Sequence, residues 1–445
     1  MRPSTIYPSS KVTGTGDYWL TVLFGFGLGL GLLKFGNPVI LNHLVTWPES
    51  LLETLFISWP LQASTFWLVI LGIGIYRWGF PRTTQHRLLY MAPAWLVWQG
   101  ISAANSPHRQ LWGITLIHFT ALLIFFETAR RWSLRLSTRG LWMGLIACFF
   151  YILWLGFEQH FGGLEATRQA FYAQPNWQSA RPDYLLKIQS TRIFSSLVYP
   201  NAFAGAILLL VPFLSVASWK HTKHWSNIPR GVLFGALITG SGACLYWSGS
   251  KAGWLIALIL LLVPILHQPF FRRWRGILIT LILLGGLSAF AWKFQGYFAK
   301  GATSASARLI YWKSAVDITL DNPLLGTGPG TYSMEFSKRK PAGAEMAKLT
   351  HNDYLEQACD SGLPGFLLFT VFLIGSVLVL GIKAWGSTGS EEFAIWVGLL
   401  GYSLQSFVEF GLYIPALSWI AFFFLGWLWG RLGTQTEAQS RKPAA

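Results

Sequence analysis

Charged residues are scarce in this chain of 445 residues. They make up 12% of it, which is half of the roughly 25% usual in soluble globular proteins. Apolar residues make up 53%, and the mean hydropathy is +0.43. By length the chain could form two or three soluble domains, but this composition excludes that organisation. It indicates an all-α polytopic membrane protein, in which apolar runs of about 20 residues each cross the bilayer.

Cysteine is scarce too. Of the three cysteines, Cys148 and Cys244 lie inside apolar runs and only Cys359 lies near a loop, which excludes a disulfide framework. No Cys-x-x-Cys pair, Cys/His metal spacing or Asp-x-Asp motif is present, so we expect neither a metal nor another cofactor. Residues 1–17 are polar and lack a small-residue cleavage site after a short apolar core. We therefore expect no cleaved signal peptide, with the first apolar run acting as the insertion signal.

Twelve apolar runs, separated by charges or Pro/Gly clusters, predict about twelve transmembrane helices. The runs cover residues 18–34, 58–76, 88–104, 111–127, 140–157, 201–218, 230–248, 252–268, 276–292, 364–382, 393–408 and 412–430. The short apolar stretch 51–59 is either an interfacial helix or an extension of the second span. The predicted organisation has nine spans within 1–292, with a loop at about 158–200, then a large helical loop at 293–363, three spans within 364–430 and a tail at 431–445.

Basic residues are unevenly divided between the two sides that this topology defines. Nineteen lie on the side of the N-terminus: Arg2, Lys11, Arg77, Arg82, Arg87, Arg130, Arg131, Arg135, Arg139, Lys220, Lys223, Arg230, Arg272, Arg273, Arg275, Lys383, Arg431, Arg441 and Lys442. The short turns on the opposite side hold only Lys34, Arg109 and Lys251. The positive-inside rule therefore predicts that both termini are cytoplasmic. Much of the net charge of +16 then marks topology, and we expect no nucleic-acid partner.

The two long outer loops hold ten of the 18 acidic residues. Titratable side chains gathered on one side, between spans, suggest chemistry or recognition at that surface; the alternative is a solvated lid without chemistry. Glu409, near the outer end of the eleventh run, is a further site candidate because an acid at membrane depth is unusual.

Residues 304–320 of the large loop are typical of an amphipathic helix. Its apolar positions recur at a spacing of three or four residues: they are Leu309, Trp312, Ala315, Val316 and Leu320. The glycine-rich segment 326–330 follows. No strand of a βαβ unit precedes it, so we reject a dinucleotide fingerprint. We interpret it as a tight loop, with a backbone contact to phosphate as the alternative.

A second helix is predicted to begin near Thr350. Thr350 can cap this helix, and Asp353, three residues on, can complete a capping box with it. The helix would end near Cys359. His351 would then lie in the first turn, where the helix dipole favours a neutral imidazole. A neutral histidine there could take a proton from a hydroxyl; a surface or structural histidine is the alternative.

Three cations are expected at the outer membrane surface. Arg192 precedes the sixth run, Lys251 lies in a short outer turn, and Arg308 lies on the loop helix. Together with His351 they would suit a substrate with a lipid-linked phosphate, which arginine can bind bidentately. Each could instead be an ordinary interfacial anchor.

Five short motifs occur in the order seen in the O-antigen ligase-like superfamily, which this chain resembles. They are Arg192 with Tyr199-Pro200-Asn201-Ala202, then Ser248-Gly249-Ser250-Lys251-Ala252, Arg308-Leu309-Ile310-Tyr311-Trp312, Asn322-Pro323-Leu324-Leu325-Gly326-Thr327-Gly328, and His351-Asn352-Asp353-Tyr354-Leu355 leading to Gly362-Leu363-Pro364-Gly365. That superfamily includes lipopolysaccharide O-antigen ligases, O-antigen polymerases and protein O-oligosaccharyltransferases.

The resemblance implies a GT-C-like glycosyltransferase of the bacterial inner membrane. It would move a glycan from undecaprenyl diphosphate to an acceptor hydroxyl on the periplasmic face, without a metal. By resemblance, His351 is the base that activates the acceptor, and Arg192, Lys251 and Arg308 bind the diphosphate. The family often has arginine where this chain has Lys251, and lysine keeps the charge but loses the bidentate fork. Asn201, Asp353 and Glu409 are possible supporting residues.

The acceptor remains open at this stage. Lipid A–core is the leading expectation, as in O-antigen ligase; a second lipid-linked glycan, as in a polymerase, and a protein hydroxyl are alternatives. Apart from donor and acceptor, the expected partners are membrane lipids. A small-solute transporter is a more distant alternative, but it should place paired ionisable groups at the bilayer midplane.

Overall fold

The structure, a computed structural model, is helical and contains no β-strand within the residues it describes. These are residues 14–440 except 82, 84, 174, 176, 180–184, 186, 187, 300–302 and 388, with only the backbone described at 170, 179 and 434–440. Among the basic residues that predicted topology, Arg2, Lys11, Arg82, Arg441 and Lys442 lie outside this part of the chain.

Each of the twelve predicted apolar runs overlaps one helix. These helices are α1 (Thr15–Lys34), α3 (Phe66–Trp78), α4 (Met91–Ala104), α5 (Arg109–Trp132), α6 (Thr138–Glu158), α9 (Pro200–His221), α10 (Asn227–Ser248), α11 (Lys251–His267), α12 (Arg275–Ala299), α15 (Asp353–Gly386), α16 (Ser390–Gln405) and α17 (Pro415–Ser440). In the described residues, eight of them are long and apolar enough to cross a membrane: α1, α5, α6, α9, α10, α12, α15 and α17. The chain is thus an all-helical polytopic membrane protein, while the count of twelve spans stays a prediction.

Other helices connect these twelve. The α-helices among them are α2 (Leu51–Phe56), α7 (Leu164–Tyr172), α13 (Thr303–Asp321) and α14 (Tyr332–Arg339). Short segments of other helix types are η1 (Val39–Leu44), η2 (Leu61–Thr65), η3 (Arg87–Tyr90), η4 (Gln159–Gly163), η5 (Trp177–Ser179), η6 (Pro269–Phe271) and η7 (Gly411–Tyr413).

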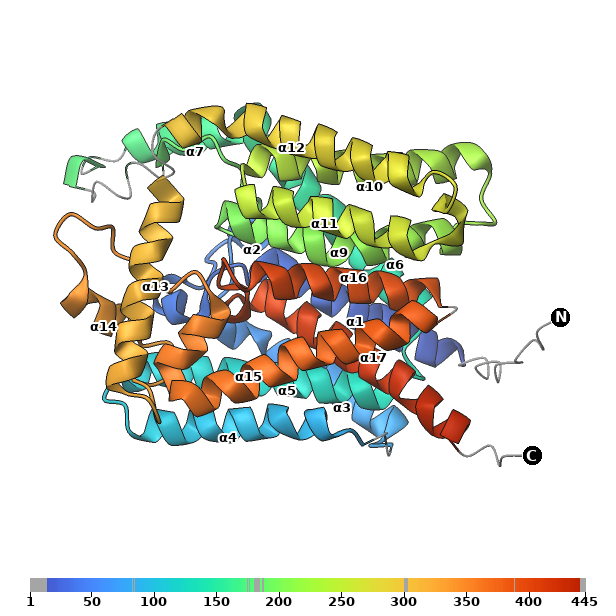
Figure 1. Ribbon diagram of the computed structural model, residues 1–445, viewed down its shortest axis with the longest axis horizontal. Helices are drawn as coiled ribbons and strands as arrows, with labels where there is room; N and C mark the ends of the chain where they lie inside the picture. Colours follow the sequence, from blue (N-terminus) through green and yellow to red (C-terminus); the bar gives the residue numbers. More distant parts are fainter. Residues whose placement is uncertain are drawn as a thin grey trace.

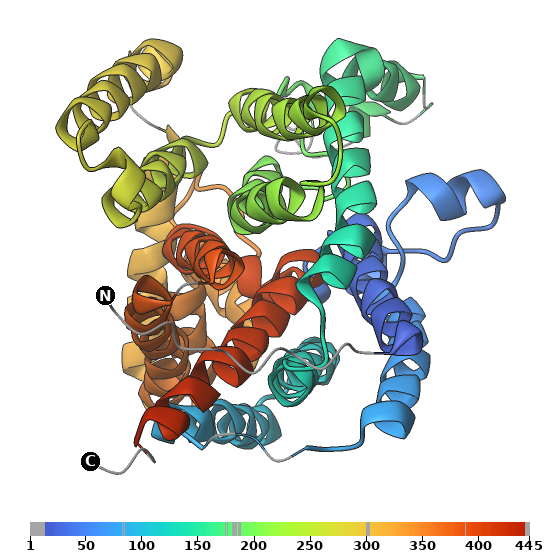
Figure 2. The same ribbon diagram turned by 90° about the vertical axis from the view of Figure 1, so that its right-hand side faces the viewer.

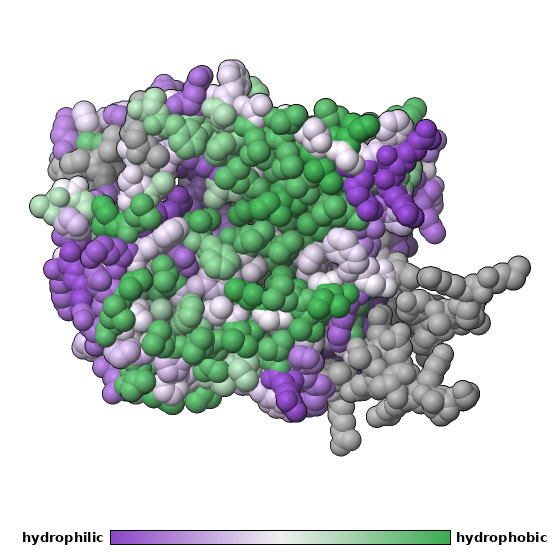
Figure 3. Space-filling model, viewed as in Figure 1, coloured by the Kyte–Doolittle hydropathy of each residue, from purple (hydrophilic) through white to green (hydrophobic). Residues whose placement is uncertain are grey.

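The long helices lie side by side, and α13 lies across one end of the bundle (Figure 1). The start of α1 and the end of α17 lie at the opposite end. On the face shown in Figure 3, apolar side chains form a broad area over the middle of the molecule, with polar side chains gathered toward the two ends. This distribution fits a bilayer across the helices, with the large loop at one membrane surface.

Helix α17 fills the centre of the bundle and α12 lies at its margin (Figure 2). In an apolar 18-residue segment of α17, 94% of the residues are buried within the protein. In the corresponding segment of α12, only 6% are buried. An apolar helix that buries almost none of its surface against protein is suited to contact with lipid. The position of α12 therefore explains why its apolar side chains are exposed.

Glycine allows α1 and α6 to approach closely. A methyl group on Gly144 of α6 would overlap the backbone of α1 at Val22 and Phe26, and one on Gly25 of α1 would overlap the backbone of α6 at Leu141. Small residues at such crossings let backbones pack against one another, which is the main source of helix association in membranes.

The predicted loop helix is confirmed as α13, but its predicted apolar face is only partly buried. Leu309 and Leu320 are 63% and 68% exposed. The buried side chains are Tyr311, Ala315 and Ile318, which cluster with aromatic residues of α14. The reason is the position of α13 across the end of the bundle, where only one side meets the protein and apolar side chains on the other side can face the membrane surface.

Candidate active site

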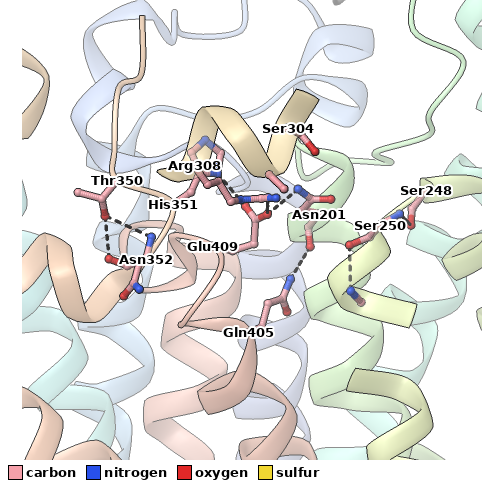
Figure 4. A network of polar contacts seen from close by, with 12 residues as sticks. Asn201, Ser248, Ser250, Ser304, Arg308, Thr350, His351, Asn352, Gln405 and Glu409 are labelled. Carbon is pink, nitrogen blue, oxygen red and sulfur yellow. Dashed lines mark hydrogen bonds and ion pairs between the residues drawn. The ribbon is translucent and has the colours of Figure 1, made fainter. Parts of the chain in front are cut away.

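Glu409 is the hub of a polar cluster at the end of the bundle crossed by α13 (Figure 4). It lies between α16 and α17 and its side chain is 7% exposed. One carboxylate oxygen, Oε2, is 3.1 Å from His351 Nδ1. The other, Oε1, accepts from Arg308 Nη2 and from Asn201 Nδ2, the latter at 2.5 Å. The cluster joins α9, α13 and the segment before α15 to one side chain.

Arg192 extends this cluster toward α10. Its Nη2 donates to Asn201 Oδ1 at 2.6 Å, and its Nε donates to the carbonyl oxygen of Ser248 at 2.7 Å. Within the described residues no hydrogen bond is formed by its Nη1, or by the buried Nε of Arg308. Both guanidinium groups therefore keep donors that are not used by the protein.

The turn between α10 and α11 leads into Lys251 and lies against the side chain of Arg192. Gly249 has a φ of +60° and ends α10 in the left-handed conformation that glycine tolerates best. Ser250 caps α11 by accepting from Gly253 N at 3.2 Å. A Cβ on Gly249 would lie 3.2 Å from Arg192 Nε, so the turn also leaves space for that side chain.

Lys251 begins α11 but does not hydrogen-bond to the cluster in the described part of the chain. Its Nζ lies 4.0 Å from the ring centroid of Tyr297 on α12, a cation–π contact. Its charge is nevertheless close enough to those of Arg192 and Arg308 to be repelled by them. Lys251 thus borders the cluster on the side of α12.

The capping box predicted at Thr350 is wrong. The N-cap of α15 is Asn352, whose Oδ1 accepts from the backbone N–H groups of Tyr354 and Leu355 at 3.0 and 3.1 Å. Thr350 Oγ1 instead donates to the carbonyl of Asn352. An asparagine amide satisfies two free N–H groups at a helix start, so the cap moves two residues on. His351 therefore precedes the cap and does not lie in the first turn.

The predicted end of this helix near Cys359 is a kink. Ser361 and Gly362 leave the helical conformation, and Gly362 has a φ of +67°. Pro364 lies just after the kink, where a missing N–H is tolerated, and α15 continues to Gly386.

His351 has a strained backbone and a well-defined ring position. Its φ is +54°, a value that is uncommon outside glycine and clusters at functional sites. The ring lies 6.0 Å from Tyr311, nearly parallel to it, and 4.7 Å from Phe410, which meets it edge-on. The side chain remains 27% exposed, so a reaction partner can reach it.

The charged side chains of the cluster shift the pKa values of one another. Burial by itself raises the pKa of Glu409, but His351, Arg308 and Arg192 lower it more, and the pKa ends below its usual value. Burial lowers the pKa of Arg192, with Glu409 opposing and Arg308 adding to this effect; an arginine stays protonated even so. One carboxylate thus faces two arginines and a nearby lysine, so the site carries excess positive charge.

Asp353, predicted as a supporting residue, lies beside the cluster and not in it. It is fully buried; its Oδ2 accepts from Leu412 N at 3.0 Å and its own N–H donates to Ser406 O at 2.8 Å. These two contacts fix both sides of the segment that carries Glu409.

Gln405 was missed by the sequence analysis: its Nε2 donates to the carbonyl of Asn201 at 2.6 Å. The signal was an amide at the end of an apolar run, four residues before Glu409.

The glycine-rich segment is a tight loop, as predicted. Thr327 N and Gly328 N donate to the carbonyls of Cys359 and Asp360, and Gly330 N donates to Asp360 Oδ2 at 2.7 Å. These N–H groups are therefore used within the protein. Among the described side chains, no three from His, Cys, Asp and Glu are grouped so that they could hold a metal ion.

The cluster and the fold define a helical membrane protein with a basic, histidine-containing site at one membrane surface. Residues 234–370 match the family described as O-antigen ligase, which confirms the resemblance to the O-antigen ligase-like superfamily. The matched segment contains Lys251, Arg308 and His351, while Arg192 and Glu409 lie outside it. No curated protein sequence matches the chain significantly.

Proposed function

We propose that this protein is an O-antigen ligase that transfers a glycan from undecaprenyl diphosphate to a hydroxyl of lipid A–core on the periplasmic face of the inner membrane. The family match supports an O-antigen ligase or polymerase type of function. The observation that carries the finer proposal is the proximity of one accessible histidine and a set of cations at the loop-covered end of the bundle.

The cations fit a diphosphate. Arg308 donates directly to the carboxylate of Glu409, and Arg192 is linked to the same carboxylate through Asn201. One carboxylate neutralises the positive charge of these two arginines only in part. Each keeps an unused donor, and charge-assisted hydrogen bonds to phosphate oxygens are about twice as strong as neutral ones. Lys251 adds a third cation at the border of the site, held against Tyr297.

The reaction needs little more than these groups. The acceptor oxygen attacks the anomeric carbon of the donor sugar while its proton passes to the imidazole of His351. The bond from that carbon to the phosphate oxygen breaks, and its electron pair leaves with undecaprenyl diphosphate. The developing negative charge faces the three cations, and preorganised cations at such a position stabilise the transition state.

The location of the cluster favours an enzyme over a transporter. A transporter is expected to hold its ionisable groups near the bilayer midplane. Here His351 and Glu409 lie in segments before and after helices, at the end of the bundle covered by α13. Assignment of this end to the periplasm is part of the proposal and follows from the basic residues expected at the opposite end.

The test uses purified protein with an undecaprenyl-diphosphate-linked glycan and lipid A–core. The variant His351→Asn removes the base and keeps a residue type that tolerates a φ of +54°. The matched control is Asp317→Asn, which removes an exposed ion pair with Lys313 on α13 that should contribute little. We expect glycan-capped lipid A–core from wild type and the control, and at least about a 100-fold lower rate from His351→Asn.

Three results would contradict the proposal. Capping by His351→Asn at the wild-type rate would exclude this histidine as the base. Growth of the lipid-linked glycan without capping would reject the ligase in favour of a polymerase, and transfer to added protein but not to lipid A–core would identify a protein oligosaccharyltransferase.

A further inference from the structure

We infer that Glu409 is a positioning residue that keeps His351 in the form with a proton on Nδ1, so that Nε2 is free to take the proton of the acceptor. This inference rests on the proposed transfer reaction and assigns a role to a residue outside the segment matched by the family. It also explains why an acid lies among cations that are needed for an anionic substrate.

The contact between the two side chains defines which nitrogen carries the proton. His351 Nδ1 lies 3.1 Å from Glu409 Oε2. An ionised carboxylate only accepts hydrogen bonds, so Nδ1 must donate, and in a neutral imidazole the lone pair then belongs to Nε2. Tyr311 and Phe410 hold the ring from two directions, so the free nitrogen has one defined direction.

The surroundings keep Glu409 ionised. The groups facing it are His351, Arg308 and Asn201, with the charge of Arg192 behind Asn201 and the buried Asp353 as its one acidic neighbour in the described residues. The charges of the two arginines and the hydrogen bond from His351 outweigh that acid. A carboxylate that stays ionised stabilises the imidazolium formed when His351 accepts a proton, because opposite charges at this distance attract strongly in a buried site.

The same carboxylate links base and cation. Oε2 contacts His351 while Oε1 accepts from Arg308, so the distance between the base and the guanidinium group is set by one rigid planar group. A shift of either by about 1 Å can cost about 100-fold in rate. Glu409 therefore positions both of the groups between which the donor sugar must lie.

The test compares Glu409→Gln with Glu409→Asp over about pH 5 to 9, the range in which histidine normally titrates. Glu409→Gln keeps the size and one acceptor but removes the charge. We expect its kcat to fall about 10- to 100-fold with a smaller change in KM, and the acid limb of the rate profile to move to lower pH, because imidazolium loses its counter-charge. Glu409→Asp should keep the acid limb in place and recover part of kcat. Asp317→Asn is the control.

A second measurement does not depend on a variant of Glu409. The ¹⁵N spectrum of histidine-labelled wild-type protein, assigned by difference against His351→Asn, should show His351 with a protonated Nδ1 when neutral. A protonated Nε2 with a bare Nδ1 would overturn the inference.

The remaining outcomes are distinguishable. If Glu409→Gln is slower but its acid limb does not move, Glu409 supports only the structure and the inference is wrong. If His351→Asn is inactive while Glu409→Gln has wild-type kinetics, the inference fails and the proposed function stands. If His351→Asn is fully active, the proposed function fails and the inference with it.

Discussion

Replacement of Arg192 by alanine should reduce transfer far more than it reduces stability. The substitution removes two hydrogen bonds within the protein, to Ser248 and Asn201, each worth about 0.5–1.5 kcal/mol net. It also removes a preorganised donor that faces the leaving diphosphate in the proposed reaction, and loss of one such donor typically costs a factor of about 10²–10³ in rate. We therefore expect kcat/KM to fall by about 10²–10³.

Arg192→Lys separates charge from geometry. Lysine keeps the positive charge, but a single ammonium group cannot repeat the planar fork that bonds Asn201 and Ser248 together. We expect kcat/KM to fall about tenfold, which corresponds to about 1.4 kcal/mol of transition-state stabilisation.

The assay measures initial rates of capping against donor concentration for wild type and both variants, alongside thermal unfolding in detergent. Unfolding midpoints lowered by only a few degrees, with the order wild type, Arg192→Lys, Arg192→Ala in kcat/KM, would support the reasoning. An Arg192→Ala enzyme within threefold of wild type would refute it, as would a loss of rate that is fully explained by unfolding.

Three further predictions concern other parts of the molecule. Lys251→Arg should keep most of the activity and Lys251→Ala should raise the KM for the donor, since Lys251 borders the site through Tyr297; equal KM values for both would exclude Lys251 from donor binding. Gly144→Leu should lower the thermal midpoint, with a cost of about 1–3 kcal/mol, because the side chain would overlap the backbone of α1; an unchanged midpoint would contradict that packing. Because the pKa of Glu409 is lowered on folding, its ionisation stabilises the fold above the ordinary glutamate pKa of about 4.3, and this contribution is lost as the pH falls through the lowered value. As the pH falls from about 4.3 to that lowered value, wild type should lose stability more steeply than Glu409→Gln, and parallel curves would show that the lowered pKa is wrong.

The helices and several site residues could be predicted because their signals are local. Apolar runs separated by charge and Pro/Gly clusters located every long helix. Arg308 and His351 were singled out because both lie in the large loop predicted to lie outside the membrane, and the structure brings both to Glu409. Lys251, predicted at the same membrane surface, borders the cluster and contacts Tyr297, and its role in binding a diphosphate stays a prediction.

The remaining features depend on distant parts of the chain. Glu409 is 58 residues from His351 and 101 from Arg308, and no spacing rule joins residues so far apart. The buried face of α13 was predicted only in part, at Ala315, because apolar periodicity indicates a buried side only when water surrounds the other side. At a membrane surface, Leu309 and Leu320 can be exposed without the same cost, so the pattern no longer distinguishes the two sides.

The central position of α17 has a consequence for how the protein is made. This helix follows in the sequence the helices α1, α5, α9, α15 and α16 that it contacts, and it is almost completely buried. During synthesis the surfaces of the earlier helices that contact α17 therefore lack this partner until α17 inserts between them. The segment that carries Glu409 becomes fixed at the same moment, because it joins α16 to α17. The last helix–helix contacts of the bundle and the completed polar cluster thus arise together, and a chain that ends before Glu409 holds Arg308 and His351 without the acid that contacts them.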